Sequence, residues 1–125
     1  VSLGTQAKPT AKTHYEVYPP LGLLYLSSMF REKSNVDVHV FDMHFKSIRM
    51  LQKNIRVDWE KMIDDAIKEY QPDLVGLSSM FGASFEGTKI VGEAIKRHSK
   101  NIIIVCGGVH MTGLANNNDE NLKFL

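Results

Sequence analysis

Apolar and polar residues alternate along this chain with two different periods, which predict helices and strands in turn. The apolar residues of 59–70 recur at helical spacing while the opposite face is charged, and Asp58 is placed to cap the first turn. A second amphipathic helix is predicted over residues 84–98. Residues 21–30 are apolar almost throughout and follow two prolines, which is typical of a buried helix with proline in its first turn.

Short apolar runs between these segments predict the strands of one sheet. Residues 74–78 carry no polar alternation, which indicates a strand buried on both faces. Residues 102–106 form the most apolar run and stop at a double glycine. Residues 36–40 alternate with a period of two, as in a strand with unequal faces. Residues 1–3 resemble the end of a strand whose beginning is missing, so we expect an excised fragment.

This order of strands and helices predicts an α/β fold, a Rossmann-like (flavodoxin-like) three-layer sandwich with a mostly parallel sheet. At 125 residues the chain has the length of a single domain, 1–125. In such sheets, ligands lie outside the carboxyl ends of the strands. The loops expected at that edge are residues 4–6, 18–22, 42–44, 78–82 and 107–110.

The charges of the chain are balanced, with 15 Lys and Arg against 14 Asp and Glu. A nucleic acid or an anionic membrane surface requires a concentrated positive patch, so we expect neither as a partner. The apolar runs have the length of strands rather than of membrane spans, and no signal peptide is recognisable, so we expect a cytoplasmic protein. The single cysteine, Cys106, excludes an internal disulfide and a cysteine-ligated zinc or iron–sulfur site within this chain.

Small residues end two strands that we expect to be neighbours, Ser78-Ser79 on one and Gly107-Gly108 on the other. Small side chains let a bulky ligand approach the backbone, while serine hydroxyls and free N–H groups orient it. We therefore predict a pocket between these strand ends. The alternative is that the glycines only form a tight turn. His110 follows the glycines and is expected at the mouth of the crevice.

Other kinds of site each lack part of their pattern. No glycine-rich phosphate loop follows the first strand, so nucleotide binding has no motif here. Asp42, Met43 and His44 offer two metal ligands without a third, so no metal site is predicted, and Asp42 is interpreted as a capping or loop-ordering carboxylate. No serine–histidine–acid set or pair of catalytic carboxylates can be assembled, so no catalytic residue is predicted.

Three blocks, residues 19–26, 72–78 and 106–112, together resemble the N-terminal cobalamin-binding domain of radical-SAM enzymes. That family includes methyltransferases and the anaerobic magnesium-protoporphyrin IX monomethyl ester cyclase, and the resemblance covers nearly the whole chain. It implies that Ser78 hydrogen-bonds the buried nucleotide tail of cobalamin and that Gly107-Gly108 leaves room for it. The cofactor-binding residues expected from the loops and the resemblance are Gly4, Thr5, Gln6, Pro19, Leu21, Gly22, Asp42, Met43, Ser78, Ser79, Met80, Phe81, Gly82, Gly107, Gly108, Val109 and His110.

The first motif of the family departs from its usual form in this chain. The family carries Asp-x-His-x-x-Gly after its first strand, and if Gly22 takes the place of that glycine, Pro19 stands where the cobalt-ligating histidine would be. Asp42-Met43-His44 imitates the start of the motif, but it follows another strand and has Ser47 in place of the glycine. We therefore expect cobalamin bound base-off, with its own base displaced and no histidine on cobalt.

The resemblance also implies a longer parent protein. S-adenosylmethionine and a 4Fe-4S cluster would belong to a radical-SAM barrel domain beyond Leu125, because that cluster needs three cysteines and this chain has one. The chain alone is then not expected to be catalytic, and would hold cobalamin for methyl transfer or related radical chemistry. Two alternatives stay open. One is a domain of the same fold that has lost cobalamin and acts as a structural or substrate-recognition module, and the other is a flavodoxin-like nucleotide-binding protein.

Overall fold

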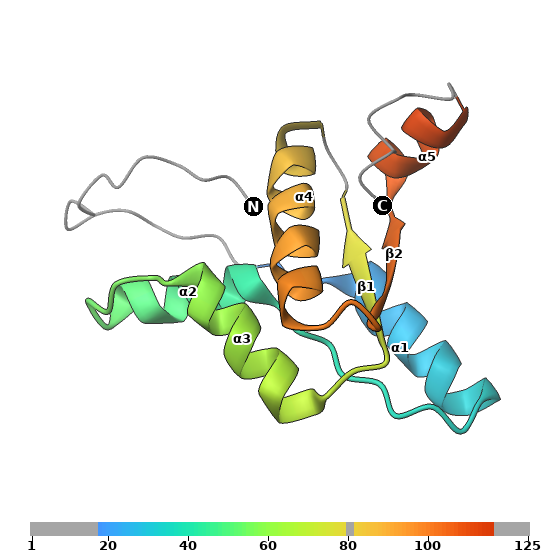
Figure 1. Cartoon of the computed structure of the whole chain (residues 1–125), viewed down its shortest axis with the longest axis horizontal. Helices are drawn as coiled ribbons and strands as arrows, with labels where there is room; N and C mark the ends of the chain where they lie inside the picture. The colour runs from blue at the N-terminus through green and yellow to red at the C-terminus, as the bar shows by residue number, and fades with distance from the viewer. Residues whose placement is uncertain (1–17, 80–81, 117–125) are drawn as a thin grey trace. The chain divides into compact units, whose positions relative to one another are not determined.

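The computed structural model describes residues 18–79 and 82–116, which belong to two compact units (Figure 1). The described part of one unit begins at Glu60, and that of the other ends at Trp59. In chain order the elements are α1 (Leu21–Lys33), α2 (Met43–Gln52), α3 (Trp59–Tyr70), β1 (Leu74–Ser78), α4 (Gly82–His98), β2 (Ile103–Gly107) and α5 (Val109–Asn116).

The unit that begins at Glu60 is built on the parallel strand pair β1 and β2. The strands pair in register from Leu74 opposite Ile103 to Ser78 opposite Gly107. Parallel neighbours need a crossover connection, and α4 supplies it, lying alongside the pair in Figure 1. The helices α3, α4 and α5 and this parallel pair confirm the predicted α/β class.

One face of the strand pair packs against α4. A Cβ atom added to Gly92 would lie 3.8 Å from Leu77 Cδ1 and 4.0 Å from Ile104 Cδ1, so the helix backbone comes close to the inward side chains of both strands. The buried apolar side chains of this unit come from α3, α4, the residue just before β2, and α5. They are Met62, Ile63, Val91, Ala94, Ile95, Ile102 and Met111. The core of the unit therefore includes the α4 side of the sheet.

The opposite face of the pair is exposed, and we call it the open face. It consists of every second residue of the two strands, which are Leu74, Gly76, Ser78, Ile103, Val105 and Gly107. The three large side chains of this face are well exposed: Leu74 is 55% exposed, Ile103 58% and Val105 50%. The prediction that residues 74–78 are buried on both faces is therefore wrong. The sequence of a strand shows how apolar each of its faces is. Whether a face is buried depends on another element that covers it, and the strand's sequence does not show that element.

The unit that ends at Trp59 contains α1 and α2. A helix follows the prolines, as predicted, but Pro20 stands at its N-cap instead of in its first turn, and the Leu24 N–H donates to the Pro20 carbonyl oxygen at 3.0 Å. Its predicted burial is wrong, because only Ser27 of this helix is buried while Leu21 and Tyr25 are 73% and 68% exposed. No helix in the described ranges, α1 included, is long and apolar enough to cross a membrane.

Residues 36–40 are extended but pair with no strand in the described part of the chain, so the strand predicted there is wrong. The alternation is realised only over residues 37–40, where Val38 and Val40 are half-buried and Asp37 and His39 are exposed, whereas Val36 is 56% exposed. Their backbone is tied locally instead, since the Arg31 guanidinium donates to the Val38 carbonyl oxygen. A period of two fits any extended segment, whereas a strand also requires a neighbour for its backbone groups.

The helix α2 was not predicted from the sequence. It follows Asp42, whose side chain accepts a hydrogen bond from the Phe45 N–H at 2.9 Å and so caps the helix. The interpretation of Asp42 as a capping carboxylate is therefore confirmed. Ile48 is the buried residue of this helix.

Candidate functional site

The carboxyl ends of β1 and β2 form a strip of nearly bare main chain on the open face. Ser78 pairs with Gly107, and both are exposed. A Cβ atom added to Gly107 or to Gly76 would meet nothing within 4 Å. We call Gly76, Ser78 and Gly107 the cradle. It offers one hydroxyl and open space above the backbone, which suits the close approach of a large ligand group.

The second glycine of the pair, Gly108, has a different role. Its φ of +104° lies in the region that favours glycine. An added Cβ would overlap the carbonyl oxygen of Ser79 and lie 2.8 Å from the carbonyl carbon of Ser79. The Ser79 N–H also donates to the Gly107 carbonyl oxygen at 2.8 Å. Gly108 is thus required for contact between the two strand-end loops, whereas Gly107 leaves space for a ligand.

The two serines after β1 are also separated by the structure. Ser78 lies on the open face, while Ser79 is fully buried, with 0% of its surface exposed. Two predicted site residues that follow, Met80 and Phe81, lie outside the described residues, and Gly82 opens α4. Of the serine pair, only Ser78 presents its side chain to the cradle.

His110 lies in the first turn of α5, beside the first turn of α4. Its ring meets the Phe85 ring edge-on, with centroids 5.3 Å apart and an angle of 66° between the planes. A Cβ atom added to Gly82 would lie 3.5 Å from His110 Cε1 and 3.8 Å from Nδ1. The half-buried imidazole therefore packs against the first turn of α4, in contact with Phe85 and close to the backbone of Gly82. Its neighbour Val109 is 75% exposed.

Cys106 occupies the α4 side of β2, next to the strand end. Burial raises the pKa of the Cys106 thiol above its usual range. A thiol with a raised pKa stays protonated at neutral pH, so it is a poor nucleophile and a poor metal ligand. With its half-buried side chain, Cys106 serves as a small packing residue on this side of β2. In the described ranges, no group of three or more His, Cys, Asp or Glu residues could hold a metal ion.

Several predicted site residues lie in the other compact unit. Pro19 precedes α1, and Leu21 and Gly22 begin it, with an added Cβ at Gly22 meeting nothing within 4 Å. Asp42 caps α2 and Met43 is its first residue. These five positions stay predictions as cofactor contacts. Gly4, Thr5 and Gln6 lie outside the described residues.

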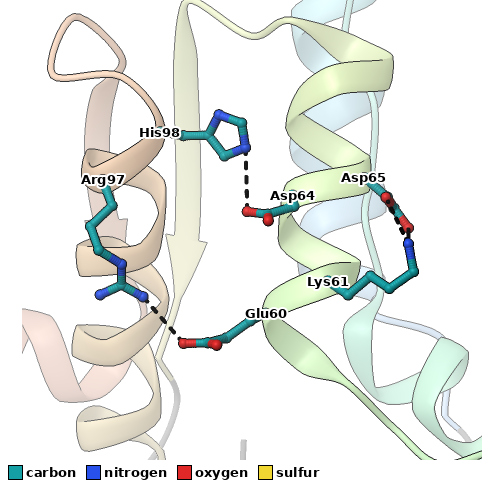
Figure 2. Close-up of polar contacts among 6 residues, drawn as sticks. All are labelled: Glu60, Lys61, Asp64, Asp65, Arg97 and His98. Carbon is teal, nitrogen blue, oxygen red and sulfur yellow. Dashed lines mark hydrogen bonds and ion pairs between the residues drawn. The ribbon is translucent and has the colours of Figure 1, made fainter.

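The far end of α4 carries charged side chains that are paired with α3 (Figure 2). Arg97 contacts Glu60 at 3.3 Å, and His98 contacts Asp64 at 3.3 Å. Surface pairs of this kind contribute at most about 1 kcal/mol each. They join two helices of the same unit and lie at the opposite end of α4 from the cradle, so they belong to the scaffold.

Sequence reasoning missed two residues of the site, Gly76 and Phe85. Glycine inside a strand often marks a place where another group approaches the backbone, and this position was the available signal for Gly76. Phe85 stands three residues after Gly82 in the sequence, which places both on one side of the first turn of α4. Nothing in the sequence indicates that His110 would be their neighbour.

Comparisons with known proteins bear on what such a site holds. A family model described as "B12 binding domain" matches residues 8–121. Among curated proteins, the chain is similar to "Uncharacterized methyltransferase PH0819" from Pyrococcus horikoshii, with 32% identity over 97 residues. That alignment covers 75% of this chain and 18% of the relative, so the chain spans less than a fifth of the relative's length. No solved structure matches the chain significantly.

Proposed function

This chain belongs to the B12-binding domain family, and from that premise we propose that it holds cobalamin base-off for methyl transfer or related radical chemistry in a radical-SAM enzyme. The observation that supports the proposal most directly is the cradle. Ser78 and Gly107 stand opposite each other at the strand ends, and added Cβ atoms at Gly76 and Gly107 would meet nothing. A cofactor with a long nucleotide tail fits a strip where side chains leave the backbone free.

In this proposal the residues of the cradle bind and orient the tail of the cofactor. The Ser78 hydroxyl donates to or accepts from a polar group of the tail. Gly76 and Gly107 allow the tail to lie against the backbone, and the apolar side chain of Val105 borders it. When bound, cobalamin supplies methyl-transfer chemistry, and this chain's contribution is to hold it in place.

Binding with the cofactor's own base displaced is supported by where the histidines of the chain stand. The family's cobalt-ligating histidine would fall at Pro19 if Gly22 takes the place of the motif's glycine. The family's histidine stands in a loop that follows a strand. His44 instead is the second residue of α2, after the Asp42 cap. We therefore propose that no histidine of this chain ligates cobalt.

The radical-SAM context is a proposal about a longer parent protein. The relative from Pyrococcus horikoshii is named an uncharacterized methyltransferase, and most of its length lies outside the aligned part. The single cysteine of this chain leaves three-cysteine ligation of a 4Fe-4S cluster to another domain. In the parent gene we expect Cys-x-x-x-Cys-x-x-Cys downstream of the codon for Leu125. A downstream sequence without that motif would remove the radical-SAM context and leave cobalamin binding untouched.

Cobalamin binding is tested with the purified chain and hydroxocobalamin. We expect a red complex that survives gel filtration, and Gly107→Val should weaken it at least about tenfold because its side chain fills the cradle. Gly113→Val is the matched control, since an added Cβ at Gly113 in α5 also meets nothing within 4 Å. A colourless protein after gel filtration would contradict the proposal, and a bound flavin spectrum would favour the flavodoxin-like alternative.

A further inference from the structure

His110 presents two polar ring nitrogens near the start of α5. Among the residues that the structure describes, none hydrogen-bonds these nitrogens, and the ring contacts that of Phe85. The imidazole nevertheless packs against the first turn of α4, because the backbone of Gly82 also lies close to it. A half-buried donor and acceptor at a strand end, with no hydrogen-bond partner in the described ranges, is suited to bind a polar group of a ligand.

The position of His110 also indicates which part of a ligand it meets. The cradle lies on the open face of the strand pair, while Leu77 and Ile104 face α4 on the other side. His110 contacts the first turn of α4 through Phe85. If the tail of a ligand occupies the cradle, the rest of the ligand lies past the strand ends. His110 would then meet the body of the ligand and not its tail.

We propose that His110 hydrogen-bonds a peripheral carboxamide of the corrin ring, while the cradle receives the nucleotide tail. This inference rests on the proposed function. The ring of cobalamin carries amide side chains around its edge, and an imidazole can donate to an amide oxygen or accept from an amide nitrogen. Because the imidazole already packs against the first turn of α4, little conformational entropy is lost when the bond forms.

The test compares cobalamin with cobinamide, a corrinoid that lacks the nucleotide tail, in titrations of the full chain followed by absorbance. His110→Ala should weaken both ligands by the same factor, about twofold to tenfold, which is the range for one hydrogen bond. Gly107→Val should weaken cobalamin and leave cobinamide unchanged. The two substitutions therefore separate a ring contact from a tail contact.

A second variant separates hydrogen bonding from packing. His110→Phe keeps an aromatic ring against Phe85 but removes both nitrogens, so it should fold like the wild type and bind both corrinoids as weakly as His110→Ala. His110→Gln, which restores a donor and an acceptor, should recover part of the affinity. Far-UV circular dichroism of each variant identifies any loss of fold. If His110→Ala unfolds, the affinities of His110→Phe alone test whether His110 hydrogen-bonds the corrin ring.

Several results would overturn the assignment. If His110→Phe weakened cobalamin alone, the contact would be with the tail, and if it weakened neither ligand, His110 would be structural. A difference between the absorption spectra of the corrinoid bound to the wild type and to His110→Phe would indicate that His110 ligates cobalt in place of an amide contact. Failure of the proposed function is a separate result, because the wild-type chain would then bind neither corrinoid.

Discussion

The backbones of Ser79 and Gly108 approach each other so closely that position 108 has no room for a side chain. An added Cβ would lie 2.8 Å from the Ser79 carbonyl carbon, and the φ of +104° disfavours any other residue. This contact joins the loop after β1 to the turn after β2. The ends of β1 and β2, which carry most of the cradle, and the start of α5, which carries His110, are therefore held to each other.

Gly108→Ala should be strongly destabilising for this reason. Both the left-handed backbone and the overlap with Ser79 oppose the new methyl group, so we expect a loss of more than about 2 kcal/mol in the free energy of unfolding. Urea denaturation measures it through the midpoint. Gly107→Ala is the paired control and should change the free energy of unfolding by less than about 1 kcal/mol, because its Cβ meets open space. Equal losses for the two variants would refute the separate roles of the two glycines.

Side-chain size at Gly76 should control cofactor affinity without harming the fold. Gly76→Ala and Gly76→Val add progressively larger groups to the cradle, so cobalamin affinity should fall stepwise, by at least about tenfold for valine. Stability should be unchanged or higher, because valine is favoured in strands. Titration with hydroxocobalamin and urea denaturation of the same samples measure both effects. Undiminished affinity in Gly76→Val would place the tail elsewhere.

Asp42 should contribute to stability as a helix cap. Asp42→Ala removes the acceptor for the Phe45 N–H, and we expect a loss of about 1 kcal/mol, measured by thermal or urea unfolding. Asp42→Ser and Asp42→Asn keep a capping oxygen and should retain most of the stability. If all three substitutions lowered cobalamin affinity and none lowered stability, the carboxylate would act on the cofactor instead of on α2.

The Cys106 thiol should make stability fall in alkaline solution. Burial raises the pKa of the thiol in the folded chain, so above the ordinary thiol pKa, about 8.5, the unfolded chain releases a proton that the folded chain retains. This contribution is complete below that pH and is lost as the pH rises through the folded value. Unfolding midpoints in urea from pH 7 to 10 should decline more steeply for the wild type than for Cys106→Ala. Parallel curves would argue against a buried thiol.

The pairing of Ser78 with Gly107 was predictable, because strands on either side of a crossover helix tend to be neighbours and their ends then lie together. The amphipathic pattern likewise placed α3 and α4 correctly, since a charged face and an apolar face at helical spacing leave few alternatives. These features depend on local sequence and on a general rule of chain connection. They required no knowledge of distant contacts.

Several features that sequence reasoning missed depend on contacts between distant segments. Positions 107 and 108 are both glycine, and only the close approach of the Ser79 backbone to Gly108 gives the two positions different roles. The alternation of residues 36–40 indicated an extended segment but could not supply the partner strand that it lacks among the described residues. The contact between His110 and Phe85 likewise arises only when the crossover brings α5 to α4.

The connection between β2 and α5 consists of Gly108 alone, since β2 ends at Gly107 and α5 begins at Val109. Because this turn is one residue long, the end of β2 sets the direction in which the His110 side chain projects. Inserting one residue into the first turn of α5 would rotate the imidazole by ~100° about the helix axis and move it away from Phe85. Loop length is therefore a determinant of ligand recognition here, and homologous chains that differ by one residue at this turn should differ in how they hold the same cofactor.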